Sequence, residues 1–300
     1  MKQIHDPTRL ASCVVVLGMF DGVHLGHQAL LRAGRELADR RQVPLCVCTF
    51  EPHPLAVLRP EAAPPRLSLP EERAALMEQY GADFLCTHSF THDFAMQPPQ
   101  DFLARLDEIY QPAGIVCGFN YRFGRAGQGN PELILAHARA RELDVSVVPC
   151  VTMDGDTVSS TRVRSLLEAG EIAQAERLLG HAYLISGTVI HGKELGRTIG
   201  FPTANIQTAP DKALPKNGVY AGCLTVRGTE YPAVVNFGRH PTLPEGGYTV
   251  EAYLPGQQLN LYGEQVTLRL SRFLRPESRF DSLQALKEQI HHDSLQVIGP

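Results

Sequence analysis

The 300-residue sequence contains no tryptophan and lacks the features that mark membrane or secreted proteins. No stretch approaches the roughly 18 consecutive apolar residues of a membrane span. The N-terminus, MKQIHDPTRL, has no apolar signal-peptide segment. Seven cysteines, an odd number in a long chain, argue against a disulfide framework. These absences predict a cytoplasmic protein with reduced, buried cysteines and no membrane partner.

Lysine is almost missing from the first part of the chain, where Lys2 is the only one before residue 184. The net charge is −4, with 17 basic and 22 acidic residues up to residue 183 and 11 and 10 after it. Neither part is a basic module, so we expect no nucleic-acid partner. Class I tRNA synthetases pair a histidine motif with a lysine-rich loop, and the lack of lysine excludes that class here.

The apolar fraction of 43% suffices for a core, and the length favours two domains. Up to about residue 183, short β-branched runs alternate with helical patterns, which predicts a Rossmann-like, doubly wound α/β domain. Asp101 and Asn130 are the predicted N-caps of two of the helices. The predicted strands are 12–17, 43–50, 83–87, 113–118 and 144–150, and the predicted helices are 27–41, 70–80, 100–110 and 130–142.

After the amphipathic segment 171–180, strand-like runs follow one another without helices between them, until a final helix at 281–291. This pattern predicts an antiparallel β-barrel with a closing helix. We therefore expect domains at 1–183 and 184–300. The predicted strands of the second domain are 183–190, 218–226, 231–237, 247–254 and 264–271.

Residues 18–27, GMFDGVHLGH, follow the first predicted strand and lead into a helix. Ligands of doubly wound sheets bind at the carboxyl ends of strands, and a helix N-terminus favours an anion. His24 and His27 are suited to donate hydrogen bonds to phosphate oxygens. Solvent-facing or metal-binding histidines are the alternatives. Gly18, Gly22 and Gly26 would let the backbone approach a bound group, and the candidate phosphate-binding residues are Gly18, Phe20 and Gly26.

Residues 159–164, SSTRVR, follow the fifth predicted strand and open another helix. Ser159, Ser160 and Thr161 are suited to cap that helix, and hydroxyls with the Arg164 guanidinium also suit a polyphosphate. Together with residues 18–27 they form a nucleotidyltransferase pattern. One segment would hold the α-phosphate region and the other the leaving pyrophosphate.

Two more segments, TFEPHP at 49–54 and GFNYRFGR at 118–125, directly follow predicted strands. Their aromatic rings are suited to stack on a planar ligand, and ordinary loop packing is the alternative. Polar side chains in the second segment would reach base or phosphate atoms. The candidate residues are Phe50, Pro52, His53, Asn120, Arg122 and Phe123.

In the second domain, residues 187–193 match G-x-x-x-x-G-K, but Glu194 stands where a P-loop has Ser or Thr. The strand also continues through the motif, so a P-loop is disfavoured. A different phosphate-holding turn is the better interpretation. Its candidate phosphate-binding residues are Gly192, Lys193, Gly196 and Arg197.

Thr203 and Asn205 alternate around Ala204 and would point to one face of an extended segment. Their hydroxyl and amide oxygens suit Mg²⁺ with ATP, and a capped turn is the alternative. Glu251 interrupts an apolar strand. It is either a solvated carboxylate or a general base that faces a substrate hydroxyl.

The chain resembles the prokaryotic bifunctional riboflavin kinase/FAD synthetase family over nearly its whole length. The segments that carry the resemblance, in order, are GMFDGVHLGH, TFEPHP, GFNYRFG, SSTRVR, GRTIGFPTAN, GVYAG, LYG and FLRPESRF.

The resemblance implies two reactions that use ATP and Mg²⁺. The C-terminal domain would phosphorylate riboflavin to FMN, and the N-terminal domain would adenylylate FMN to FAD, releasing pyrophosphate. In such families the residues matching His24, His27, Asn120 and Arg164 serve the adenylylation site. Those matching Thr203 and Asn205 hold Mg²⁺–ATP, and that matching Glu251 is the kinase base.

The sequence departs from the family at two places. Met19 stands where asparagine is common, and the segment after Glu251, AYLPG, lacks the usual histidine and aspartate. The rival functions are an adenylyltransferase for another phosphate-bearing acceptor and a non-catalytic flavin-binding protein. The sequence leaves the oligomeric state open.

Overall fold

The structure is a computed structural model that describes the chain except residues 193–195, 197–199, 240–247 and 299–300. The chain divides into two compact units, Met1–Ser159 and Ser160–Pro300. Each unit is described by itself below. The predicted boundary after residue 183 stays a prediction.

The first unit is built on a parallel sheet of six strands in the order β1-β4-β3-β2-β5-β6. The five predicted strands are confirmed, and β1, a short polar strand, is an additional one at the sheet edge. A two-stranded hairpin, β7–β8, follows the sheet. The strands are β1 (Lys2–His5), β2 (Val14–Leu17), β3 (Leu45–Glu51), β4 (Phe84–Ser89), β5 (Gly114–Gly118), β6 (Asp144–Val148), β7 (Thr152–Met153) and β8 (Asp156–Thr157).

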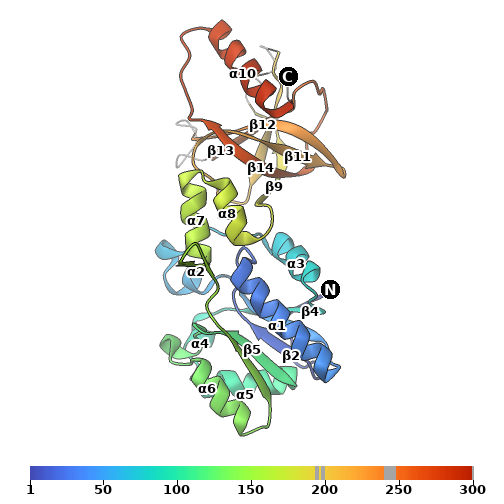
Figure 1. Ribbon diagram of the computed structural model, residues 1–300, viewed down its shortest axis with the longest axis vertical. Coiled ribbons are helices and arrows are strands. Elements are labelled where there is room, and N and C mark those ends of the chain that lie inside the picture. The colour runs from blue at the N-terminus through green and yellow to red at the C-terminus, as the bar shows by residue number, and fades with distance from the viewer. Residues whose placement is uncertain (193–195, 197–199, 240–247, 299–300) are drawn as a thin grey trace. The chain divides into compact units, whose positions relative to one another are not determined.

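Helices cover both faces of this sheet (Figure 1), as the Rossmann-like prediction requires. Helices α1 and α3 pack on one face, and α5 and α6 pack on the other. Asn130 caps α6 as predicted, but the prediction for Asp101 is wrong, because α5 begins two residues earlier behind Pro98. The helices are α1 (Leu25–Arg41), α2 (Pro54–Leu58), α3 (Pro70–Gln79), α4 (His92–Ala95), α5 (Pro99–Tyr110) and α6 (Pro131–Arg139), with 3₁₀ turns at Pro60–Ala62 and Arg125–Gly127.

The sheet face under α5 and α6 contains five buried cysteines, and all seven cysteines of the chain are free thiols. Burial raises the pKa of Cys48 to about 12 and that of Cys117 to about 11. These thiols therefore stay protonated and pack as small apolar groups, which confirms the predicted burial for these five, whereas Cys150 and Cys223 are half-buried. The five are Cys13, Cys46, Cys48, Cys86 and Cys117.

The second unit contains a closed barrel in the strand order β10-β13-β12-β11-β14-β9. All pairs are antiparallel, as predicted. Strand β10 was expected only as an extended segment. The strands are β9 (Leu184–Ile190), β10 (Thr203–Thr208), β11 (Gly218–Val226), β12 (Thr229–Arg239), β13 (Tyr248–Tyr253) and β14 (Gln265–Arg275).

Within the described residues, this unit also contains the helices α7 (Ser160–Ala169), α8 (Ile172–Leu179) and α10 (Leu283–Ile298). The Leu167 carbonyl of α7 accepts a hydrogen bond from the Lys216 amide beside the barrel. Helix α10 is the predicted closing helix, and its buried Asp293 binds the Arg275 guanidinium at 2.8 Å. Among the described residues, no helix combines the length and apolar character needed to cross a bilayer.

Candidate active sites

Strand β2 lies at the centre of the first unit's sheet, with β3 on one side and β5 on the other. From β2 the chain continues through β3 and β4 on one side and then crosses to β5 on the other. Such a switch point, at the carboxyl ends of the strands, is where doubly wound sheets bind ligands. Residues 18–27, 49–54 and 118–125 all lie at the ends of these three strands. The structure therefore brings the three predicted segments to one edge of the sheet.

The backbone of residues 18–27, called here the His loop, is strained. Phe20 and Val23 have positive φ values of 55° and 38°, and Gly22 has a φ of 80°. A non-glycine residue in this region costs about 1–3 kcal/mol and persists only where surrounding contacts enforce it. Strain of this kind is typical of functional loops.

His24 and His27 form a stacked pair, with ring centroids 3.7 Å apart and an interplanar angle of 16°. His24 Nδ1 accepts a hydrogen bond from the His27 amide at 3.3 Å and so caps helix α1. Because Nδ1 is the acceptor, the proton of neutral His24 is on Nε2. The cap uses Nδ1, and the Nε2 proton of His24 stays available for the predicted hydrogen bond to phosphate.

The imidazole of His27 is neutral at physiological pH. Burial lowers the pKa of His27 well below its usual value, and His24 and Arg73 act in the same direction. His27 Nδ1 is buried and has no hydrogen-bond partner within the described part of the chain. The ring packs against Phe20, with centroids 5.2 Å apart.

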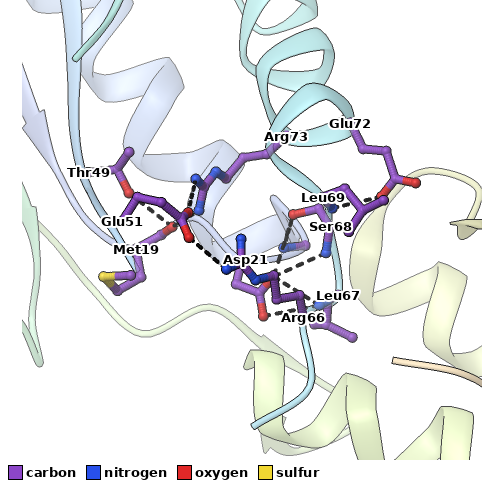
Figure 2. A network of polar contacts seen from close by, with 11 residues as sticks. Met19, Asp21, Thr49, Glu51, Arg66, Leu67, Ser68, Leu69, Glu72 and Arg73 are labelled. Carbon is purple, nitrogen blue, oxygen red and sulfur yellow. Dashed lines mark hydrogen bonds and ion pairs between the residues drawn. The ribbon is translucent and has the colours of Figure 1, made fainter. Parts of the chain in front are cut away.

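A polar network holds the strained loop from behind (Figure 2). Asp21, only 7% exposed, accepts hydrogen bonds from the Leu67 amide at 2.9 Å and the Ser68 amide at 3.1 Å. The Ser68 hydroxyl accepts one from the Gly22 amide at 3.0 Å. The segment before α3 thus holds the Asp21 side chain and the Gly22 backbone, which helps to offset the strain of the loop.

The carbonyl of Met19 is bound from the next strand and from helix α3 (Figure 2). Thr49 Oγ1 donates to it at 3.2 Å, and Arg73 Nη1 lies 3.5 Å from it. Arg73 Nη2 also contacts Glu51 Oε2 at 3.1 Å. Met19, where the related sequences commonly have asparagine, therefore makes these contacts through its backbone carbonyl and not through its side chain.

The aromatic residues predicted to stack on a planar ligand belong to one cluster. Phe50, at the end of β3, packs at 5.2 Å from Phe94, and Phe123 packs at 4.9 Å from Phe102 and 5.8 Å from Tyr121. Phe50 and Phe123 are themselves buried, at 7% and 6% exposure.

The polar candidates of the same segments lie nearer to the solvent. Pro52, Asn120 and Arg122 are exposed, and His53 caps the short helix α2 through its Nδ1. The two segments thus combine a buried aromatic wall with an exposed polar rim.

His88 extends this cluster into the core. Its Nε2 lies 2.5 Å from the Tyr110 hydroxyl, and its Nδ1 is buried without a partner among the residues described. Burial lowers the pKa of His88 to about 4, with Arg105 acting in the same direction and Asp6 in the opposite one. The folded chain therefore resists protonation of this ring.

We expect acid to destabilise the first unit through His88. An unfolded His88 binds a proton below about pH 6.5, whereas the folded one does so only near pH 4. Stability is thus lost as the pH falls, by about 2 kcal/mol between about pH 7.5 and pH 5. Hydrogen exchange of residues 84–110, corrected for intrinsic rates, measures this loss.

The H88Q variant is expected to lose less stability over the same pH interval, because glutamine does not titrate and still reaches the Tyr110 hydroxyl. H92Q, at an exposed histidine, is the matched control. An unchanged pH dependence in H88Q would assign the effect to another group.

Residues 159–164 are separated from β6 by the β7–β8 hairpin, so they do not follow the fifth predicted strand directly. A Cβ built on Gly26 would lie 3.8 Å from the Val158 carbonyl oxygen, so the chain reaches the His loop just before Ser159. Ser160 is the first residue of α7. The phosphate-binding role of Ser160, Thr161 and Arg164 stays a prediction.

In the barrel, Asn205 and Glu251 are register partners on the neighbouring strands β10 and β13. Glu251 is also paired with Asn236 on β12. Because Ile206, Val250 and Ala252 are buried in the barrel, these polar side chains alternate with them and lie on its outer face. The expectation that Thr203 and Asn205 share one face is confirmed.

Two described glycines, Gly192 and Gly196, lie close to neighbouring groups. A Cβ on Gly192 would collide with the Asn205 amide, and one on Gly196 would collide with the Phe201 carbonyl. Beside Thr203 lies a cleft of about 670 Å³, a size that suits a small-molecule substrate. Lys193 and Arg197 lie outside the described residues.

Comparison with known proteins decides the family. Residues 6–162 match the family described as FAD synthetase, and residues 179–298 match the one described as riboflavin kinase. The "bifunctional riboflavin kinase/FMN adenylyltransferase" of Listeria monocytogenes is 35% identical over 93% of this chain and 90% of its own length. The proteins of that name from Escherichia coli and Bacillus subtilis are 36% and 33% identical, over 94% and 99% of this chain and 91% and 98% of their own lengths.

The chain belongs to this family. A solved structure from Streptococcus pneumoniae, named a macrolide-efflux protein, covers 100% of both chains with a TM-score of 0.92 and 30% identity. That likeness agrees with the order of the two units along the chain. The name of the Streptococcus protein describes that protein alone. The two consecutive family matches, to FAD synthetase and to riboflavin kinase, correspond to the two activities in the name of these relatives.

The sequence of this member of the family did not point to the residues behind the His loop. Asp21, Ser68 and Arg73 come together only through contacts between segments about fifty residues apart. The one available signal was an arginine on the buried side of the helix predicted at 70–80.

Proposed function

We propose that this chain makes both flavin cofactors. Its second unit transfers the γ-phosphoryl group of ATP to the 5′-hydroxyl of riboflavin, which gives FMN. Its first unit transfers AMP from a second ATP to the FMN phosphate, which gives FAD and pyrophosphate. The observation that carries the proposal is the match of two consecutive parts of one chain to the two families.

In the first unit, His24 and His27 are proposed to donate hydrogen bonds to the ATP phosphates as charge builds up during transfer. Gly18, Phe20 and Gly26 allow the backbone to approach, and Asn120 serves the same site. Ser159, together with Ser160, Thr161 and Arg164 of α7, is proposed to hold the leaving pyrophosphate. The FMN phosphate is already an anionic nucleophile, so this transfer needs no general base.

The flavin is proposed to lie against the end of β3 and the segment after β5. The aromatic cluster around Phe50 and Phe123 offers an apolar wall for the flavin ring system. Pro52, His53 and Arg122 are the proposed contacts at its rim.

In the second unit, Thr203 and Asn205 are proposed to hold Mg²⁺ with ATP, because a hydroxyl and an amide oxygen share one face and suit a hard cation. When bound, Mg²⁺ would neutralise charge on the phosphates. The turn with Gly192, Lys193, Gly196 and Arg197 is proposed to hold those phosphates. Glu251 is proposed to accept the proton of the riboflavin hydroxyl.

One incubation tests this assignment. Purified protein is mixed with riboflavin, ATP and Mg²⁺, and the products are separated by chromatography over time. FMN followed by FAD is expected, and an excess of EDTA is expected to stop both products. If FAD forms only when FMN replaces riboflavin in the mixture, the protein is an adenylyltransferase with a binding barrel. If neither product forms, it is a flavin-binding protein.

We also place the chain in the cytoplasm, where ATP and flavins are available. The seven free thiols support this assignment, since cysteines form disulfides in oxidising compartments such as the periplasm or the extracellular space.

A further inference from the structure

Arg73 is buried behind the His loop with a guanidinium that joins two strand ends (Figure 2). It is 6% exposed, although arginine is almost never fully buried unless it is paired. Its partners are the Met19 carbonyl at 3.5 Å and Glu51 Oε2 at 3.1 Å. Such a position is costly unless each contact is made, so its location calls for an explanation.

The two partners of Arg73 belong to the two sides of the proposed adenylylation site. Met19 is in the His loop, five residues before His24. Glu51 ends β3, directly after Phe50, and its Oε1 also binds Arg66 Nη2 at 2.7 Å. One planar group therefore links the phosphate-contacting loop to the flavin-contacting strand end.

We propose that Arg73 is a positioning residue for adenylyl transfer: it holds the His loop and the end of β3 in one fixed relation. This role rests on the function proposed above. Transfer needs the ATP α-phosphorus and the FMN phosphate aligned at the same moment, whereas each substrate binds mainly to its own side. A residue that links the sides therefore acts on transfer more than on either binding step.

The R73M variant tests this role, because methionine fills the space without the contacts. We expect the kcat of FAD formation to fall by about 10- to 100-fold, the usual cost of a small misalignment. The Kd of ATP and the Kd of FMN, each measured alone by calorimetry, are expected to change less than about threefold. Riboflavin phosphorylation by the same protein is expected to stay unchanged.

Two further variants keep the test decisive. In R73K the ammonium reaches Glu51 or the Met19 carbonyl but does not span both, so kcat should recover in part. E51Q removes the negative charge of the Arg73 partner on β3 and is expected to lower the kcat of FAD formation in the same way. This variant keeps the proposal testable if R73M does not fold.

Arg35 provides the matched control. It is partly buried and binds Asp83 at 2.8 Å and Asp39 at 2.7 Å, yet none of these contacts involves the His loop or β3's end. R35M loses two ion pairs, whereas R73M loses one ion pair and one contact with a carbonyl, and R35M is nevertheless expected to keep the wild-type kcat.

Different failures have different meanings. If the wild-type protein forms no FAD from FMN and ATP, the proposed function is wrong, and the role of Arg73 is wrong with it. If the wild type forms FAD and R73M keeps its kcat, only the role of Arg73 is wrong. A Kd for ATP or FMN that weakens in step with kcat would show a binding residue instead of a positioning one.

Discussion

Replacement of His27 by alanine is expected to lower FAD formation from FMN and ATP by about 100-fold or more, while riboflavin phosphorylation stays at the wild-type rate. The loss is large because a donor aimed at developing charge in a closed site typically contributes a factor of 10²–10³. The kinase is spared because its proposed residues, Thr203, Asn205 and Glu251, all belong to the barrel.

The geometry makes this variant specific. His24 caps helix α1 through the backbone amide of His27, which alanine retains. H27A therefore removes the imidazole and its stacking on His24 without removing the cap. The H24A variant would lose both the ring and the cap and so would be harder to interpret.

The measurement uses one protein preparation and two substrates. FMN with ATP reports adenylylation, and riboflavin with ATP reports the kinase. H92A, at an exposed histidine of the same unit, serves as the control and should keep both rates. Equal loss of FMN and FAD production in H27A would contradict the division of labour between the two units.

The sequence sufficed to predict the architecture because its main signals are local. Apolar runs separated by helical periods identified the sheet from β2 to β6, and Asn130 with Pro131 marked the start of α6. Closely spaced strands without helices identified the barrel. Strand β1 was missed because its four residues, KQIH, have no apolar pattern and pair only at the sheet edge.

Other features depend on contacts that a local pattern does not contain. Asp101 looked like an N-cap, but Pro98 and Pro99 start α5 earlier and leave Asp101 within its first turn. Arg73 and Met19 are 54 positions apart, and only the folded sheet brings them together. The two histidines of the candidate site were therefore readable from the sequence, and the network behind their loop was not.

Replacement of Glu251 by glutamine is expected to give the opposite pattern from H27A. Riboflavin phosphorylation should fall by about 10²–10⁴, the usual contribution of a general base. FAD formation from supplied FMN should be unchanged. Glutamine keeps the size of the side chain and its capacity for hydrogen bonds, so the loss would report the missing proton acceptor.

The position of Glu251 separates this prediction from a general effect on the barrel. Its neighbours along β13, Val250 and Ala252, fill the interior, whereas Glu251 lies on the outer face between Asn205 and Asn236. A change there leaves the apolar core intact, so thermal stability should change little.

Glu230 is the control carboxylate, because it lies on the adjacent strand β12 and pairs with Arg269 at 2.6 Å on the surface. E230Q is expected to retain kinase activity, since an exposed ion pair contributes little to stability and Glu230 is not in the register of Asn205. Chromatography of riboflavin, FMN and FAD compares the two variants directly. Wild-type phosphorylation by E251Q would rule out Glu251 as the base and leave the substrate hydroxyl to transfer its proton to the phosphate oxygens.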